Sequence, residues 1–200
     1  MRILIVGGNG TIGRKVTTHL SKENDLIIAG RKSGDLTVDI SDSTSIKAMF
    51  EKIGQLDAII CIAGEAKWAA FNDLTEEDYY IGLKSKLMGQ VNLVRIGMKC
   101  LNKKGSITLS TGILADDPVF KTTSAAMVNG GIHSFVQAVA LEVENGIRVN
   151  VVSLGMVEDA YEKYKDYFPG HNPISMNKAI NAYDRSVSGK DNGKIIRIYN

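Results

Sequence analysis

This sequence of 200 residues contains few cysteines and histidines and carries little net charge. Two isolated cysteines, Cys61 and Cys100, are too few for a disulfide framework, and the three histidines show no metal-ligand spacing. We therefore predict no structural metal. Lys and Arg total 24 against 22 Asp and Glu, a formal net charge of +2, whereas nucleic-acid-binding proteins usually carry a strong basic excess. The balance predicts no nucleic-acid partner.

Long hydrophobic runs are also missing. The longest run, Ala58–Ala63, is far shorter than the ~20 residues that a membrane-spanning helix needs. The apolar start at Ile3–Gly7 is too short for the hydrophobic region of a secretory signal. We therefore expect a cytoplasmic protein with no membrane partner. No linker, repeat or low-complexity tract interrupts residues 1–200, so we expect a single domain.

Short apolar runs alternate with segments of helical periodicity. Ala58–Ala63 is apolar on both faces, which is typical of a parallel strand covered by helices on both sides. We predict an α/β fold with a single Rossmann-type, doubly wound, mainly parallel β-sheet and helices on both faces. The predicted strands are 2–6, 26–29, 36–40, 58–63, 106–109, 147–152 and 194–199, and the predicted helices are 11–20, 41–53, 75–101, 123–144 and 174–186.

A glycine-rich turn follows the first predicted strand and opens the first predicted helix. Gly8, Gly10 and Gly13 form a Gly-x-Gly-x-x-Gly pattern, which lets a backbone approach a pyrophosphate at a helix N-terminus. Arg14 follows Gly13, so the sequence lacks the Lys-Ser/Thr pair of a Walker A loop. The alternative is a turn without a ligand. The predicted cofactor contacts of this turn are Gly7, Gly8, Asn9, Gly10, Thr11, Ile12 and Gly13.

The end of the second predicted strand is basic. NAD sites usually place Asp or Glu there, about 20 residues beyond the glycines, to bind the ribose hydroxyls. This chain has Arg31, Lys32 and Ser33 instead. Arg31 can stack on adenine and pair with a 2′-phosphate, so the position favours NADP(H) over NAD(H). A solvated basic loop is the alternative.

In this order the motifs resemble the short-chain dehydrogenase/reductase family over essentially the whole chain. The resemblance also rests on Gly89 and on the segments Ile147–Asn150 and Ser153–Gly155. Cys61-Ile62 stands where the family has two asparagines, and Leu154 stands where it has proline. The resemblance implies that Asp39 binds adenine beside Ile40 and that Val157 approaches the nicotinamide carboxamide. The other implied cofactor contacts are Ala63, Gly64 and Gly155.

The family's catalytic tyrosine and lysine have no counterpart by this resemblance. Aligning back from Ile147–Asn150 puts their positions at Ala125 and Asn129, and residues 122–135 contain neither Tyr nor Lys. The family's serine position falls at Ser110 or Thr111, and its helix asparagine aligns with Lys86.

These substitutions lead to a modified catalytic set. We expect Thr111 or Ser110 to polarise a carbonyl, Lys86 to supply charge or the proton because burial lowers a lysine pKa, and Asn129 to hold the ribose. The alternative for Lys86 is a side chain that runs along the helix to solvent. A lone helix histidine such as His133 is usually structural or exposed.

The sequence thus predicts an NADPH-dependent oxidoreductase for a small carbonyl or alcohol. The alternative is a catalytically inactive NADP(H)-binding sensor or scaffold, and a weaker one is an epimerase or isomerase on the same fold. The cofactor half covers about residues 1–110, and a substrate-covering segment covers about 156–186. Trp68 and Phe71 either line the substrate pocket or cover the sheet, and we favour covering. Apolar faces on the two long helices predict a homodimer or homotetramer.

Overall fold

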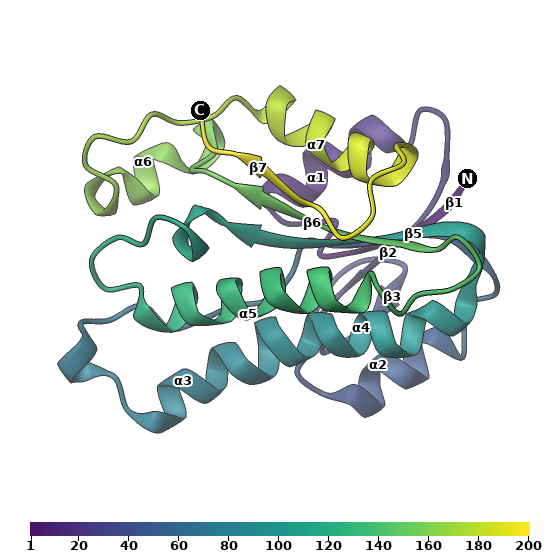
Figure 1. Cartoon of the computed structure of the whole chain (residues 1–200), viewed down its shortest axis with the longest axis horizontal. Helices are drawn as coiled ribbons and strands as arrows, with labels where there is room; N and C mark the ends of the chain where they lie inside the picture. The colour runs from purple at the N-terminus through teal and green to yellow at the C-terminus, as the bar shows by residue number, and fades with distance from the viewer.

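The computed structural model describes residues 1–200, and its seven strands form one sheet (Figure 1). The strand order is β3-β2-β1-β4-β5-β6-β7, and all neighbours are parallel. The predicted doubly wound Rossmann-type sheet is confirmed. Its chain order reverses between β1 and β4, where ligands of such sheets bind at the carboxyl ends of the strands. The strands are β1 (Arg2–Val6), β2 (Asp25–Gly30), β3 (Leu36–Thr37), β4 (Leu56–Cys61), β5 (Leu101–Gly112), β6 (Arg148–Leu154) and β7 (Ile195–Ile198).

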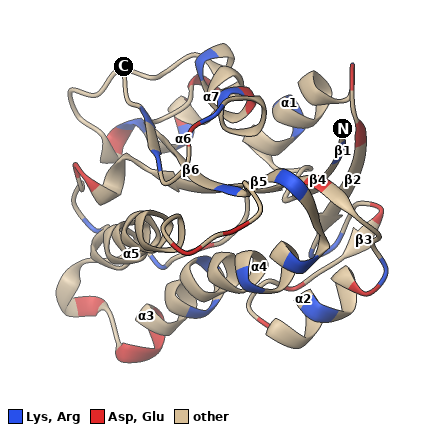
Figure 2. Cartoon of the chain, turned by 45° about the vertical axis from the view of Figure 1, so that its right-hand side comes forward, with Lys and Arg blue, Asp and Glu red and all other residues tan.

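Helices cover both faces of this sheet. In Figure 1, α2, α4 and α5 lie on one face, and α1 and α7 lie on the other. A capping box at the start of α3 joins Thr75 and Asp78, where Figure 2 shows acidic residues. No helix has the length and apolar character to cross a membrane. The helices are α1 (Thr11–Leu20), α2 (Ser43–Phe50), α3 (Glu76–Gly82), α4 (Gly89–Gly97), α5 (Thr123–Val139), α6 (Tyr161–Tyr164) and α7 (Met176–Ser188).

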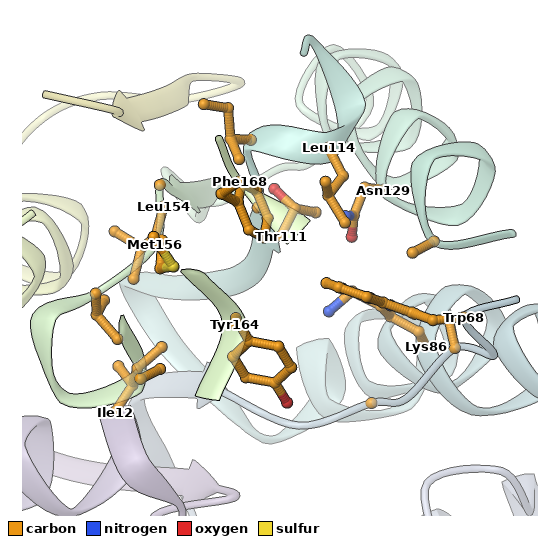
Figure 3. Close-up of a pocket in the computed structure, with 18 of the residues that line it drawn as sticks. Ile12, Trp68, Lys86, Thr111, Leu114, Asn129, Leu154, Met156, Tyr164 and Phe168 are labelled. Atoms are coloured by element: carbon orange, nitrogen blue, oxygen red, sulfur yellow. The ribbon is translucent and has the colours of Figure 1, made fainter. Parts of the chain in front are cut away.

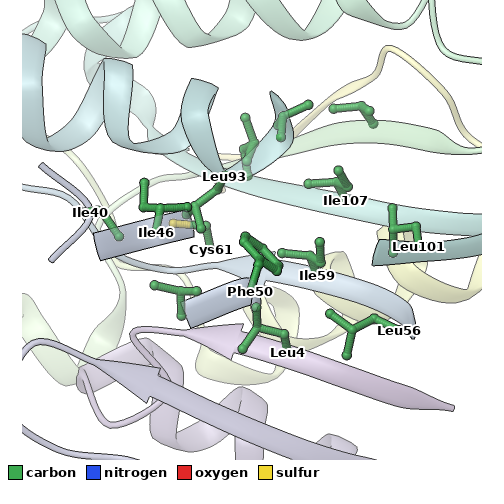
Figure 4. Close-up of a cluster of buried hydrophobic side chains, with 14 of the residues drawn as sticks. Leu4, Ile40, Ile46, Phe50, Leu56, Ile59, Cys61, Leu93, Leu101 and Ile107 are labelled. Carbon is green, nitrogen blue, oxygen red and sulfur yellow. The ribbon is translucent and has the colours of Figure 1, made fainter. Parts of the chain in front are cut away.

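The hydrophobic core has one large cluster on each face of the sheet. Leu4 and Val6 of β1 point into the cluster under α2, α4 and α5, and Figure 4 shows Phe50 and Leu93 meeting the strands there. Ile3 belongs to the other cluster, under α1 and α7. Each fully buried side chain of this size contributes about 1.5–3 kcal/mol. Because both faces are covered, the strands read as continuous apolar runs.

The predicted helix at 75–101 is divided into pieces. α3 ends at Gly82, Leu83–Met88 forms a turn of π-helix, and α4 follows. The loop after β4 lies directly against this wide turn, since a Cβ on Gly64 would fall 2.9 Å from Cα of Lys86. Single π-helical turns occur frequently at functional sites. This turn carries Lys86.

Several element ends also differ from the prediction. α5 ends at Val139 rather than at residue 144, and the following turn reaches Asn145 and Gly146 with left-handed φ of 57° and 71°. β5 begins at Leu101, with a break in register before its main pairing with β4. The third strand is only two residues long, so the predicted adenine-binding residues lie in the loop beyond it.

Candidate active site

The glycine-rich turn joins β1 to α1 and leaves no room for a Cβ at Gly7 or Gly13. Gly7 has a left-handed φ of +87°, and a Cβ there would lie 2.5 Å from the carbonyl oxygen of Ile62. A Cβ on Gly13 would lie 2.9 Å from the backbone of Gly8. No side chain caps the N-terminus of α1, and its first turn holds no acidic residue. The turn therefore fits a bound phosphate, which free N–H groups and the helix dipole both favour.

The predicted adenine end lies beside this turn. Asn9 Nδ2 donates to Ser33 Oγ over 3.0 Å, which joins the glycine-rich turn to the basic loop. Arg31 is half exposed and pairs with Glu65 at 3.1 Å, and this pairing raises the pKa of Arg31. Hydrogen bonds from Ser41 lower the pKa of Asp39. Glu65 was missed in the sequence because it lies 34 positions from its partner.

A cavity of about 480 Å³ opens at the carboxyl ends of the central strands (Figure 3). It runs from Ile12 in the glycine-rich turn to the residues expected to do chemistry. The cavity has the size of ordinary small-molecule sites and lies near the reversal in strand order. The predicted site residues in its lining are Ile12, Gly64, Lys86, Thr111, Asn129, Gly155 and Val157. Ala63 lies behind Gly7, and Ile40 lies behind Gly89, both outside the lining.

Lys86 is the cationic side chain of the cavity. It is half-buried in the π-helical turn, and Figure 3 shows its amine directed into the pocket beside Trp68. No carboxylate lies within ion-pair distance of it, and burial lowers its pKa. The amine is therefore available to a substrate oxygen. Nearby Cys61 is buried. Burial raises the pKa of its thiol to about 11, so the thiol stays protonated.

The two candidate hydroxyls at the end of β5 are not equivalent. Ser110 Oγ donates to the carbonyl oxygen of Cys61 over 2.5 Å and pairs with the Tyr183 hydroxyl at 2.8 Å. It lies outside the cavity lining, on the α7 side of the sheet. Thr111 lines the cavity. The alternation of side chains along a strand separates the two, so we correct the candidate set by removing Ser110.

One face of α5 carries Ala125, Asn129 and His133 toward the site, at intervals of four residues. Asn129 is only 4% exposed, and its Oδ1 atom has no hydrogen-bond partner. An unpaired buried acceptor is costly, so this atom fits a donor such as a ribose hydroxyl. His133 Nε2 pairs with Thr111 Oγ1 at 2.8 Å. In the sequence, the four-residue spacing between Asn129 and His133 was the one signal for His133. A lone helix histidine is usually structural or exposed, so His133 was left out of the predicted site.

Comparison with known proteins identifies the family. A family model described as enoyl-(acyl carrier protein) reductase matches residues 13–185. The chain belongs to the short-chain dehydrogenase/reductase family of oxidoreductases.

Individual relatives of this family agree with that assignment. The chain is 24% identical to an acetoacetyl-CoA reductase of Cupriavidus necator, over 76% of this chain and 73% of that one. It matches the structure of protein lin1944 from Listeria innocua with a TM-score of 0.98 and 42% identity, over 100% of both chains. A small-chain dehydrogenase crystallised in complex with NADPH matches with a TM-score of 0.87 and 26% identity, over 99% of this chain and 96% of that one.

In this family member, the floor of the cavity is tied to the end of the chain. Arg197 on β7 makes a two-pronged pair with Asp116 at 2.8 and 3.0 Å, and the Tyr199 hydroxyl also donates to Asp116. These partners lower the pKa of Asp116 to about 2, whereas burial raises the pKa of Tyr199 to about 12. Tyr199 also pairs with Ser153 of β6 at 2.9 Å. The network fixes the strand ends beneath the site.

An aromatic cluster forms the outer wall of the cavity. The ring of Trp68 lies 5.6 Å from that of Tyr164 and 6.4 Å from that of Phe168, and all three side chains line the pocket. We had expected Trp68 to cover the sheet, but in the structure it lines the cavity. Phe71 is 69% exposed and lies outside the lining. The covering segment thus supplies apolar contacts opposite Lys86 and Thr111.

Proposed function

We propose that this protein is an NADPH-dependent oxidoreductase for a small carbonyl or alcohol. The observation that carries the proposal is one continuous cavity, which begins at the glycine-rich turn and ends at Lys86, Thr111 and Asn129. This cavity connects a turn suited to a phosphate with polar side chains suited to a substrate oxygen. The NADPH complex of a related dehydrogenase supports the choice of cofactor.

The residues present fit NADPH. The backbone of residues 7–13 would hold the pyrophosphate, and Arg31, Lys32 and Ser33 would hold the 2′-phosphate. Bound NADPH would supply a hydride to the substrate carbon. The remaining proposed contacts are Asp39 and Ile40 at adenine, Ala63 and Gly64 along the cleft, Asn129 at the ribose, and Gly155 and Val157 at the nicotinamide end.

The chain's own side chains would act on the substrate oxygen. The Thr111 hydroxyl would orient and polarise the carbonyl, and Lys86 would stabilise negative charge developing on its oxygen. The ammonium of Lys86 has no competing carboxylate, so its charge is available to the substrate oxygen. The aromatic wall would exclude water from this end of the cavity.

Calorimetric titration with NADPH and, in parallel, NADH tests the cofactor. We expect a clear preference for NADPH, which Arg31→Ala should remove. Equal binding of both would take Arg31 out of the cofactor site, and binding of neither would overturn the oxidoreductase proposal.

NADPH oxidation over a panel of aldehydes and ketones tests the reaction. We expect turnover with at least one, and a loss of rate in Lys86→Ala and Thr111→Ala. NADPH binding without turnover of any carbonyl or alcohol would instead favour the sensor or scaffold.

We also propose that two copies associate through their long helices. Met88 and Met127, in the π-helical turn and α5, are 46% and 45% exposed, which is unusual for large apolar side chains. Light scattering after size exclusion should give a dimer or tetramer. A monomer at micromolar concentration would contradict this.

A further inference from the structure

We propose that His133 supplies and receives the catalytic proton through the Thr111 hydroxyl. This inference rests on the proposed oxidoreductase function. It concerns a buried pair, of which Thr111 lines the cavity and His133 lies in the electrostatic field of Asp116 and Arg197.

Geometry requires His133 to act through another group. His133 lies eight residues after Ala125 on the same face of α5, and a helix rises ~1.5 Å per residue, so the two positions are roughly 12 Å apart. The imidazole therefore cannot stand in place of an acid at Ala125. Thr111 bridges the gap, because its Oγ1 lies 2.8 Å from His133 Nε2 while the residue lines the cavity.

The pair is sheltered from solvent. His133 is 6% exposed and Thr111 is 8% exposed. The charged groups that face His133 are Asp116, which follows β5, and Arg197 on β7. Burial lowers the pKa of His133, and Asp116 partly opposes this by favouring the imidazolium. The imidazole is therefore a titrating group whose protonation is set by burial and by Asp116.

The protonation of His133 decides what Thr111 offers the cavity. When Nε2 carries a proton and donates to Oγ1, the Thr111 hydroxyl hydrogen is free to donate to a carbonyl oxygen. When neutral Nε2 accepts instead, Thr111 Oγ1 offers lone pairs that suit the hydroxyl of an alcohol. The two states match the two directions of the reaction.

The proton balance closes in both directions. In reduction, the carbonyl carbon accepts the hydride that NADPH supplies, and the C=O π pair moves to oxygen. That oxygen takes the Thr111 proton while Oγ1 takes the Nε2 proton of the His133 imidazolium, which becomes neutral and is reprotonated from water. Alcohol oxidation runs in reverse, with the proton leaving through neutral His133.

The proposal fixes the sign of the pH dependence. Reduction needs protonated His133, so its kcat should be full at low pH and fall as pH rises through the His133 pKa. Alcohol oxidation needs the neutral form, so its kcat should rise over the same range. Because burial lowers that pKa, both transitions should lie below the usual histidine range.

The first test compares pH profiles of reduction. His133→Gln keeps a hydrogen-bonding side chain but cannot titrate, so we expect kcat to fall by roughly 10²-fold and its pH dependence to flatten. His19→Gln, at a partly exposed position of α1, is the matched control and should retain the wild-type profile. A His133→Gln protein that is folded, by circular dichroism, and keeps the wild-type profile would overturn the proposal.

The second test does not depend on turnover. Side-chain ¹⁵N NMR can follow the His133 titration in the wild type and in Thr111→Val, which removes the hydroxyl and keeps the shape. If the imidazolium donates to Thr111, the variant should lower the His133 pKa further. An unchanged or raised His133 pKa in this variant would overturn the proposed proton transfer between His133 and Thr111, whatever the activity of the protein. A lowered pKa in a protein that turns over no substrate overturns the proposed function instead.

Discussion

The two ends of the cavity are built in different ways. The proposed cofactor end uses backbone from one contiguous segment, residues 7–13, where close contacts leave no room for a Cβ on Gly7 or Gly13. The proposed catalytic end draws on side chains from separate elements: Lys86 on the π-helical turn, Thr111 on β5, and Asn129 and His133 on α5. A site made of backbone tolerates few substitutions, because no other residue can replace its glycines. A site made of side chains tolerates more, since a proton can reach the same substrate oxygen from a side chain on another element.

The largest effect should come from adding one methyl group at the cofactor end. In Gly13→Ala the new Cβ would press on the backbone of Gly8, so the turn must open and NADPH affinity should fall by at least about 100-fold. Gly130→Ala on α5 is the matched control, since nothing lies within 4 Å of its added Cβ. Calorimetry with both variants measures the effect. If Gly13→Ala binds like wild type, the backbone turn does not hold the cofactor.

The next effect should separate the two ends. Lys86→Met keeps much of the side-chain volume but removes the charge, so kcat should fall about 10²-fold while NADPH affinity stays near that of wild type. Exposed Lys84→Met, two residues earlier, should change neither value. Steady-state kinetics and calorimetry provide the two measurements. A Lys86→Met variant that loses NADPH binding but not kcat would place Lys86 at the cofactor end.

A smaller effect should come from releasing Arg31. Glu65→Gln removes the charge that pairs with the guanidinium, so Arg31 becomes available to the 2′-phosphate. We expect a severalfold gain in NADPH affinity and no change for NADH, because exposed ion pairs contribute only about 0–1 kcal/mol. Glu51→Gln, which removes an exposed carboxylate at the end of α2, is the control. A loss of NADPH affinity would show that Glu65 helps rather than competes.

The smallest effect concerns the network beneath the catalytic end. The pKa of Asp116 is lowered to about 2, below the ~3.9 of an unfolded chain, so its contribution to stability is present above that value. It should be lost as pH falls from about 4 to 2. Asp116→Asn should lower Tm at neutral pH and weaken its dependence on acid in that range, as thermal melts can measure. Asp73→Asn, at an exposed loop, should melt like wild type.

The fold and the glycine-rich turn could be predicted from the sequence because their signals are local. An apolar strand, a glycine-rich turn and a helix of regular spacing follow one another within residues 2–20, and the structure reproduces those boundaries. The basic loop at residues 31–33 was also predicted from its position just after a strand. Its partner Glu65 could not be predicted in this way, because it is distant in the sequence.

The catalytic end could be predicted only in part. Lys86, Thr111 and Asn129 came from the family resemblance, and all three line the cavity. Ser110 and Thr111 could not be ranked, because only the register of β5 against its neighbours decides which hydroxyl enters the cavity. The π-helical turn that carries Lys86 left no clear mark in the periodicity.

By itself, the sequence determined the order of strands and helices and the glycine-rich turn between β1 and α1, since both depend on contacts between near neighbours in the chain. Tertiary structure alone decided that His133 meets Thr111, that Trp68 and Lys86 line one cavity, and that Arg197 pairs with Asp116. These residues lie 22 to 81 positions apart where a contact joins them. Their meeting follows from sheet register and helix packing, which no local pattern records.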